Sequence, residues 1–178
     1  MKEKIIKVYE YSELSKEAKK KVLNFFREIN DFPFLSEQLE EYLKELLTNN
    51  KIEFDNSLKI GYSLSNCQED GFNFIDNITY KKMLIRVFKN NSHYEHYNTV
   101  GNDIIDFNGV YYEELDDNQK EKADKLLIEF EAKYKDIFRK CEYYGYKIIE
   151  TEQSEESIKD NIEANGYTFR ENGDIENI

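Results

Sequence analysis

The sequence contains no tryptophan, and among its 178 residues it has one proline, Pro33, and only two cysteines and two histidines. Cys67 and Cys141 lie far apart, and the first residues contain no apolar segment of the length that a secretory signal needs. These features predict free thiols and a location in a reducing cytoplasm. No apolar run approaches the roughly 18 residues of a membrane-spanning helix, so we expect no membrane partner.

Basic residues are scarce in the second part of the chain. Residues 1–100 carry 15 Lys and Arg against 16 Asp and Glu, whereas residues 101–178 carry 10 against 21, so most of the net charge of -12 lies there. A protein that binds duplex DNA or RNA directly needs a basic face that neutralises phosphates. The distribution argues against direct nucleic-acid binding and favours protein partners with basic surfaces, although a negative surface can also serve solubility alone.

Aromatic residues supply an unusual share of the apolar content, with 14 Tyr and 12 Phe in a chain that is 39% hydrophobic. Phenylalanine and tyrosine bring large buried areas to a core. A chain of this length and composition fits one globular domain, which we expect to extend over residues 1–178.

Helical periodicity is clearest at the start of the chain and after residue 115. Apolar residues recur at spacings of three and four on both sides of Pro33, which predicts two N-terminal helices, the first capped by Ser12 or Ser15. A long helix is predicted to be capped by Asp116 or Asp117, with Gln119 as the capping-box partner, and to run for about six turns. Gly145 is predicted to end it.

The last 25 residues predict a short helix and a hairpin. Ser154 is suited to cap a short acidic helix, and Asn165-Gly166 is a left-handed C-cap signal. Asn172-Gly173 predicts a closing hairpin with a type I′ turn, because that dipeptide accommodates positive φ angles.

Between Lys51 and Phe107 the apolar period changes to two, which indicates antiparallel strands. Residues 83–88 are apolar at nearly every position, as expected for a central strand covered on both faces. The predicted strands cover residues 58–65, 71–75, 82–88 and 98–107. The fold class is therefore α+β: an antiparallel β-meander of three to four strands with two N-terminal helices, one long helix, and a short C-terminal helix plus hairpin.

Two polar segments stand at the ends of these strands. The first reads Asn-Cys-Gln-Glu-Asp-Gly from residue 66, and the second, residues 91–99, holds both histidines. Loops at the same end of neighbouring strands lie about 5–10 Å apart, so we expect the two segments to meet. The candidate partner- or ligand-binding residues here are Ser65, Gln68, Asp70, His93, Tyr94 and His96.

The same residues allow other interpretations. A metal would need a third ligand beside the histidines, from Cys67, Glu69 or Asp70, and no zinc signature is present, so we expect no metal and no cofactor. A nucleophile at Ser65 or Cys67 with a histidine base is conceivable, but there is no nucleophile elbow, phosphate loop or paired-carboxylate pattern. The alternatives are a structural turn, or a small enzyme or ligand- or metal-binding protein with its pocket at the residues Gln68, Asp70, His93 and His96.

An acidic segment follows the long helix. Its carboxylates either form a solvated helix face or imitate phosphates and occupy a nucleic-acid channel in another protein. The segment contains Glu150, Glu152, Glu155, Glu156, Asp160 and Glu163, with Lys159 as the one cation inside it. The candidate partner-binding residues are Glu152, Glu155 and Glu156.

Three motifs together carry a family resemblance. They are S-E-L-S-K-E-A-K at residues 12–19, S-L-S-x-C-Q-x-D-G-x-x-F at residues 63–74, and N-S-H-Y-x-H-x-N-T at residues 91–99. The chain resembles, up to about residue 110, a family of small acidic proteins from phages and mobile elements of Gram-positive and related bacteria, sometimes labelled antitoxin-like. Members usually carry glycine where this chain has Glu69.

The resemblance implies a setting and a class of function. It implies a phage or prophage gene product in the cytoplasm of a bacterial host. We expect a non-enzymatic inhibitor of a host protein machine, either a counter-defence protein such as an anti-CRISPR or an antitoxin. Its partner would be a host protein with a basic, nucleic-acid-binding surface.

Overall fold

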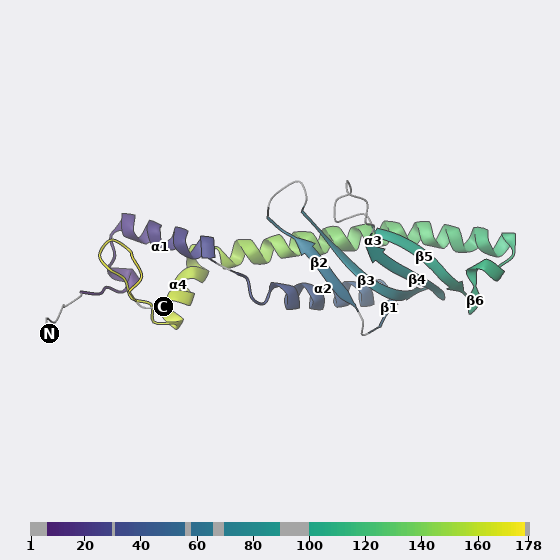
Figure 1. Ribbon diagram of the computed structural model, residues 1–178, viewed down its shortest axis with the longest axis horizontal. Helices are drawn as coiled ribbons and strands as arrows, with labels where there is room; N and C mark the ends of the chain where they lie inside the picture. Colours follow the sequence, from purple (N-terminus) through teal and green to yellow (C-terminus); the bar gives the residue numbers. More distant parts are fainter. Residues whose placement is uncertain (1–6, 30, 56–57, 66–69, 90–99, 177–178) are drawn as a thin grey trace. The chain divides into compact units, whose positions relative to one another are not determined.

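The computed structural model describes residues 7–29, 31–55, 58–65, 70–89 and 100–176. The described part has four α-helices and a six-stranded antiparallel sheet, so the predicted α+β class with a β-meander is confirmed (Figure 1). The chain divides into two compact units: unit 1 comprises residues 1–33 and 147–178, and unit 2 comprises residues 34–146. A single domain over 1–178 stays a prediction, because compact units can still fold together.

Unit 1 contains α1 (Lys16–Ile29), α4 (Glu155–Ala164) and a 3-10 turn, η1 (Tyr11–Glu13). Both helices begin at predicted serine caps: Ser15 Oγ accepts a hydrogen bond from Ala18 N (3.2 Å), and Ser154 Oγ accepts one from Ser157 N (3.1 Å). Apolar residues at helical spacing meet in one core, which consists of Tyr11, Leu14, Ala18, Val22, Leu23, Phe26, Ile158, Ile162 and Phe169.

The C-terminal hairpin forms in unit 1, but its turn differs from the prediction. Phe169 makes isolated β-bridges to Tyr9 and Ile175. Gly173 has a φ of 84°, whereas Asn172 is not among the residues with positive φ, and Gly173 N donates to the Arg170 carbonyl (2.9 Å). A type I′ turn needs positive φ at both central residues, so that prediction is wrong, and the loop has three residues with Gly173 at the left-handed position.

Unit 2 holds the sheet. Its strands are β1 (Ile52–Phe54), β2 (Lys59–Ser63), β3 (Gly71–Tyr80), β4 (Met83–Lys89), β5 (Val100–Phe107) and β6 (Val110–Tyr111). The order is β1-β3-β4-β5-β6, and β2 pairs with the first half of β3. The turn η2 (Tyr112–Glu114) leads from β6 into α3 (Asp117–Glu152).

Two hairpins of the sheet have two-residue loops in the left-handed conformation. Lys81 and Lys82 (φ 48° and 65°) join β3 to β4, and Asn108 and Gly109 (φ 57° and 80°) join β5 to β6. Both pairs have the signs that a type I′ turn requires. The second pair is an Asn-Gly, as the rule predicts, whereas the first places two lysines where glycine or asparagine is preferred.

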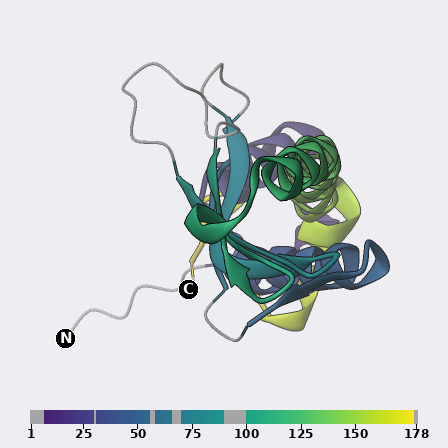
Figure 2. The ribbon, with the colours of Figure 1, turned by 90° about the vertical axis from the view of Figure 1, so that its right-hand side faces the viewer.

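Aromatic side chains join the sheet to α3. Phe74 of β3 packs against Tyr134 (ring centroids 5.2 Å apart), and Phe72 packs against Phe138 (6.0 Å). Tyr80 packs against Phe130 (5.7 Å). These offset and edge contacts are the arrangements that aromatic pairs prefer. Seen from the end of the sheet, α3 lies over one of its faces (Figure 2).

The helix α2 (Leu35–Asn49) packs beside α3 in unit 2. The rings of Tyr42 and Tyr144 are 4.2 Å apart, and Leu39, Leu43 and Leu47 are fully buried. Together with the aromatic contacts, this gives one core between the sheet and the two helices.

The core covers β4 on one face only. Met83, Ile85 and Val87 are buried, whereas Arg86 between them is exposed, so the prediction of two covered faces is wrong for this strand. Cover on both faces occurs instead at Gly71–Phe74 of β3, where four successive residues are buried. Runs of apolar residues therefore do not identify the doubly covered segment, because β4 has paired strands on both sides and still exposes Arg86.

Gly145 does not end α3, which continues to Glu152, so the predicted stop is wrong. The glycine is buried, and a Cβ built on it would clash with Leu64 Cδ1 and lie 3.4 Å from Leu39 Cδ2. Its function is a close approach of the helix to the segment after β2. In the described part of the chain, no helix has the length and apolarity to cross a membrane.

Candidate functional site

Two of the predicted site residues, Ser65 and Asp70, meet in unit 2. Asp70 is 8% exposed and directly precedes β3. Its Oδ1 accepts hydrogen bonds from Ser63 Oγ (3.1 Å) and Ser65 Oγ (3.0 Å), and its Oδ2 accepts one from Tyr146 OH. Ser65 and Asp70 are therefore in contact, whereas their predicted binding of a partner or ligand stays a prediction.

The arrangement stabilises a buried charge. Hydrogen bonds to an ionised acceptor are about twice as strong as neutral ones, and a buried carboxylate needs them to offset its lost hydration. The β2–β3 hairpin places Ser63 opposite Gly71, next to Asp70, while Tyr146 comes from α3. Asp70 therefore fastens the hairpin to the helix, which is a structural function.

Glu142 of α3 interacts electrostatically with Asp70. Partial burial, and then the negative charge of Asp70, raise the pKa of Glu142 above its usual value. Among the described residues, no group of three or more His, Cys, Asp or Glu is placed to hold a metal ion.

The rest of the predicted polar site lies outside the described residues. This applies to Gln68, His93, Tyr94 and His96, and only Ser65 and Asp70 of that set are described. The meeting of the two polar turns stays a prediction, and so does the alternative pocket.

The predicted acidic residues Glu152, Glu155 and Glu156 belong to unit 1, whereas Ser65 and Asp70 belong to unit 2. All three glutamates are exposed. Glu155 pairs with Lys159 (2.8 Å), and this contact lowers the pKa of the Glu155 carboxyl. Lysine and glutamate one turn apart neutralise each other, so Glu155 adds little net charge to the surface.

Three further carboxylates form what we call the α4 acidic face: Glu156, Asp160 and Glu163. They are exposed, and their spacings of four and three residues place them on one side of the helix. Ile158 and Ile162 bury the other side in the core of unit 1. Within the described part of the chain, none of the three has an ion-pair partner.

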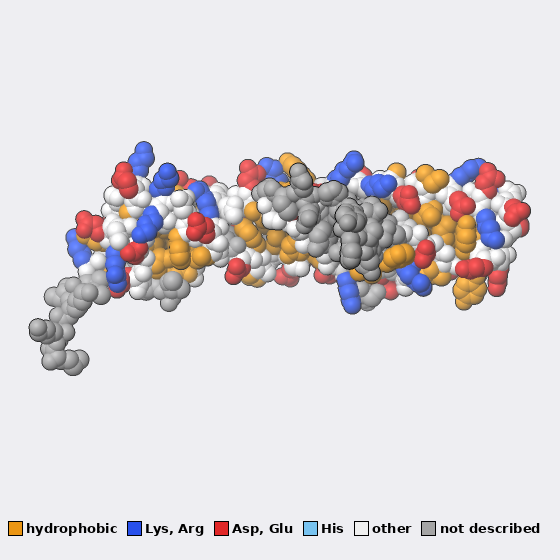
Figure 3. Space-filling model, turned by 45° about the horizontal axis from the view of Figure 1, so that its top comes forward, with side chains coloured by type: hydrophobic (Ala, Val, Ile, Leu, Met, Phe, Trp, Pro, Cys, Tyr) orange, Lys and Arg blue, Asp and Glu red, His pale blue; other side chains and the backbone are white. Residues whose placement is uncertain are grey.

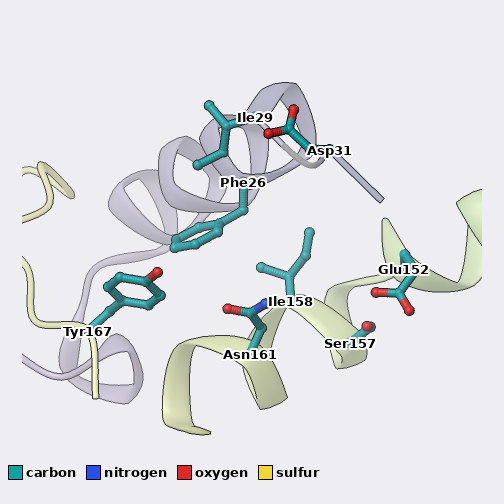
Figure 4. A pocket seen from close by; sticks show the side chains of 8 residues that line it. All are labelled: Phe26, Ile29, Asp31, Glu152, Ser157, Ile158, Asn161 and Tyr167. Carbon is teal, nitrogen blue, oxygen red and sulfur yellow. The ribbon is translucent and has the colours of Figure 1, made fainter. Parts of the chain in front are cut away.

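A small cleft in unit 1 is lined in part by residues of α4 (Figure 4). Its volume is about 160 Å³. Phe26 and Ile158 supply buried apolar side chains, and Asp31 and Glu152 supply exposed carboxylates. The lining residues are Phe26, Ile29, Asp31, Glu152, Ser157, Ile158, Asn161 and Tyr167. Ser157 and Asn161 directly follow two members of the α4 acidic face in sequence.

The size and lining of the cleft limit what it can hold. Pockets for drug-sized ligands and cofactors measure about 300–1,000 Å³, so this cleft suits a single side chain or a small amine. Apolar walls fit the aliphatic stem of a lysine or arginine, and nearby carboxylates fit its charged end.

Sequence reasoning found Glu152 but missed the other residues of the cleft. Asp31 stands in a helix-breaking segment, and Asn161 stands in a short acidic helix, so neither position carries a local signal of binding. The cleft exists because α1 packs against α4, and the residues of these two helices are far apart in the chain.

Comparison with protein-family models, with curated proteins and with solved structures found no match. The resemblance to small acidic phage proteins stays a prediction that rests on the three sequence motifs.

Proposed function

We propose that this protein is a non-enzymatic binding protein that occupies a basic surface of another protein. The observation that carries the proposal is the combination, within unit 1, of the α4 acidic face and the cleft. The α4 acidic face supplies three carboxylates that form no ion pair among the described residues, and the cleft supplies a place for one basic side chain.

The α4 acidic face is a rigid row of charges. With a rise of 1.5 Å per residue, Glu156 and Glu163 lie about 10 Å apart along the helix axis. This length is close to the Debye length of about 8–10 Å near physiological salt, so all three carboxylates attract an approaching basic surface at the same time. A row of this kind competes for a surface that otherwise binds the phosphates of a nucleic acid.

The cleft gives this attraction a specific contact. A lysine or arginine from the partner places its stem against Phe26 and Ile158 and its cation near Asp31 and Glu152. Long-range attraction raises the rate of encounter, and the buried side chain slows dissociation.

The sequence resemblance supplies the biological setting of the proposal. The partner is a host protein with a basic, nucleic-acid-binding surface in the bacterial cytoplasm, and the protein acts as a counter-defence inhibitor such as an anti-CRISPR, or as an antitoxin. The net charge of -12 supports a protein partner over direct contact with nucleic acid.

An oligolysine peptide tests the electrostatic part of this proposal. Neutralising the α4 acidic face by Glu156→Gln, Asp160→Asn and Glu163→Gln is expected to slow association with the peptide in stopped-flow fluorescence, and the effect is expected to shrink as salt is raised.

The matched control neutralises three exposed glutamates of α2 in unit 2, by Glu37→Gln, Glu41→Gln and Glu45→Gln. Both variants lose three negative charges, so equal effects would assign the binding to overall charge and contradict the proposal. A Glu152→Gln variant is expected to weaken the complex mainly through faster dissociation.

A further inference from the structure

The outer edge of β5 is mostly unpaired. This strand pairs with β4 from Val100 to Phe107, with a register shift that leaves Ile105 without a partner in β4, whereas β6 pairs only with Asp106 and Phe107. After Tyr111 the chain turns into η2. Within the described part of the chain, residues 100–105 therefore have no strand on their outer side.

The register of the hairpins identifies the free backbone groups. In a hairpin with a two-residue loop, the residues on either side of the loop, here Tyr80 and Met83, hydrogen-bond to each other. The backbone N–H and C=O groups of Leu84 and of every second residue after it in β4 therefore point toward β5. Arg86 is then hydrogen-bonded to its partner Asp103. The backbone N–H and C=O groups of the alternate residues, Asn102 and Ile104, point away from β4 toward the free edge.

A groove of about 570 Å³ borders this edge. Apolar and aromatic side chains line it, among them Tyr111, which is 63% exposed, and the partly buried Ile104 and Leu127. Asn102 also lines it, and its Oδ1 atom is buried without a hydrogen-bond partner among the described residues. Hydrophobic side chains lie among carboxylates at this end of the sheet (Figure 3, right).

Negative charge predominates in the groove. Its lining includes three carboxylates, Asp103, Glu113 and Asp124, and one cation, Arg86. Lys120 lies beside it, with its Nζ atom directed at the Glu113 carbonyl oxygen (3.4 Å). Even with both cations counted, an excess of negative charge remains for a ligand to complement.

We propose that the free edge of β5 binds an extended, basic segment of a partner protein as an additional strand. Backbone hydrogen bonds to Asn102 and Ile104 hold the segment, and this mode needs only an unpaired edge and an extended ligand. Because side chains alternate along a strand, the segment combines apolar residues on the groove side with lysines or arginines near the carboxylates. This surface lies in unit 2 and extends the proposed function to a second contact.

A capped peptide of alternating lysine and valine tests the proposal. It is expected to bind the whole protein and to slow the hydrogen exchange of the Asn102 and Ile104 amides, measured by NMR. The control is the same peptide with alternate backbone nitrogens methylated, which keeps the charge and the side chains but removes donors. Its affinity is expected to be lower by a factor of at least about ten, since it cannot complete the backbone hydrogen bonds to β5.

Three results would overturn the proposal. One is equal affinity of the methylated peptide, and another is exchange protection confined to residues outside β5. A third is protection of Asn102 and Ile104 that rises with protein concentration in the absence of peptide, which would assign the edge to a second copy of the chain.

One variant separates this proposal from the function proposed for unit 1. The protein with the α4 acidic face neutralised is expected to keep the protection of Asn102 and Ile104 by the alternating peptide. Failure of one proposal is thereby distinguishable from failure of the other.

Discussion

Removing one hydroxyl from the core of unit 2, by Tyr134→Phe, is expected to stabilise the protein. Tyr134 of α3 is 2% exposed, and its OH atom has no hydrogen-bond partner among the described residues. Burial alone raises the pKa of this phenol far above its usual value, which reflects the same loss of hydration.

The magnitude follows from the surroundings of the ring. An unpaired buried hydroxyl costs about 1–3 kcal/mol relative to one in water. The ring contacts with Phe74 (5.2 Å), Phe130 (5.4 Å) and Phe138 (4.0 Å) do not depend on the hydroxyl. Since only the unfavourable contribution disappears, Tyr134→Phe should raise the free energy of unfolding by about 1–2 kcal/mol.

Tyr80→Phe is the matched control. Tyr80 is equally buried, but its OH donates to Glu129 Oε1 (2.6 Å). Loss of a hydrogen bond to a charged acceptor costs about 1.5–3 kcal/mol, so this variant should be destabilised. Urea unfolding monitored by circular dichroism compares the midpoints at unchanged m-value. If both variants lose stability to the same extent, Tyr134 OH has a partner and the reasoning fails.

Two further predictions concern backbone geometry and charge. Gly173→Ala should destabilise the protein clearly more than Gly166→Ala. Both glycines have positive φ (84° and 63°), but only at Gly173 would a Cβ meet backbone, 2.8 Å from a carbonyl oxygen. Equal losses of stability in thermal unfolding would refute the steric argument. Glu142→Gln should stabilise the protein near pH 7. The raised pKa of Glu142 means that ionising it disfavours the folded state, and that penalty begins above the ordinary pKa of about 4.5, so the gain should vanish in more acidic urea titrations; a gain that persists there would contradict the assignment.

The elements that the sequence predicts well are those with local signals. Ser15 and Ser154 cap their helices because the caps depend on neighbouring residues. Ser65 and Asp70 were predicted to belong to one polar turn, and they meet because only five positions of a hairpin separate them.

The features that sequence reasoning missed depend on distant packing. Local rules predict that a helix ends at Gly145, but this residue lies inside α3 and packs closely against the side chains of Leu39 and Leu64. The loop of Lys81 and Lys82 departs from the preference of such turns for Asn-Gly. Lys81 forms an ion pair with Glu129 (2.8 Å), a tertiary contact that local turn rules do not include. The cleft in unit 1 likewise requires two helices that only folding brings together.

The missing side chain at position 145 has an electrostatic consequence. Leu64, which approaches Gly145, stands in the chain directly between Ser63 and Ser65, the two serines that hydrogen-bond Asp70. A side chain at position 145 would therefore press on a residue whose backbone is continuous with both serines. A substitution at 145 would thus act on the hydrogen bonds of a buried carboxylate from both sides, through Leu64 and through the adjacent Tyr146, although residue 145 itself makes none of them.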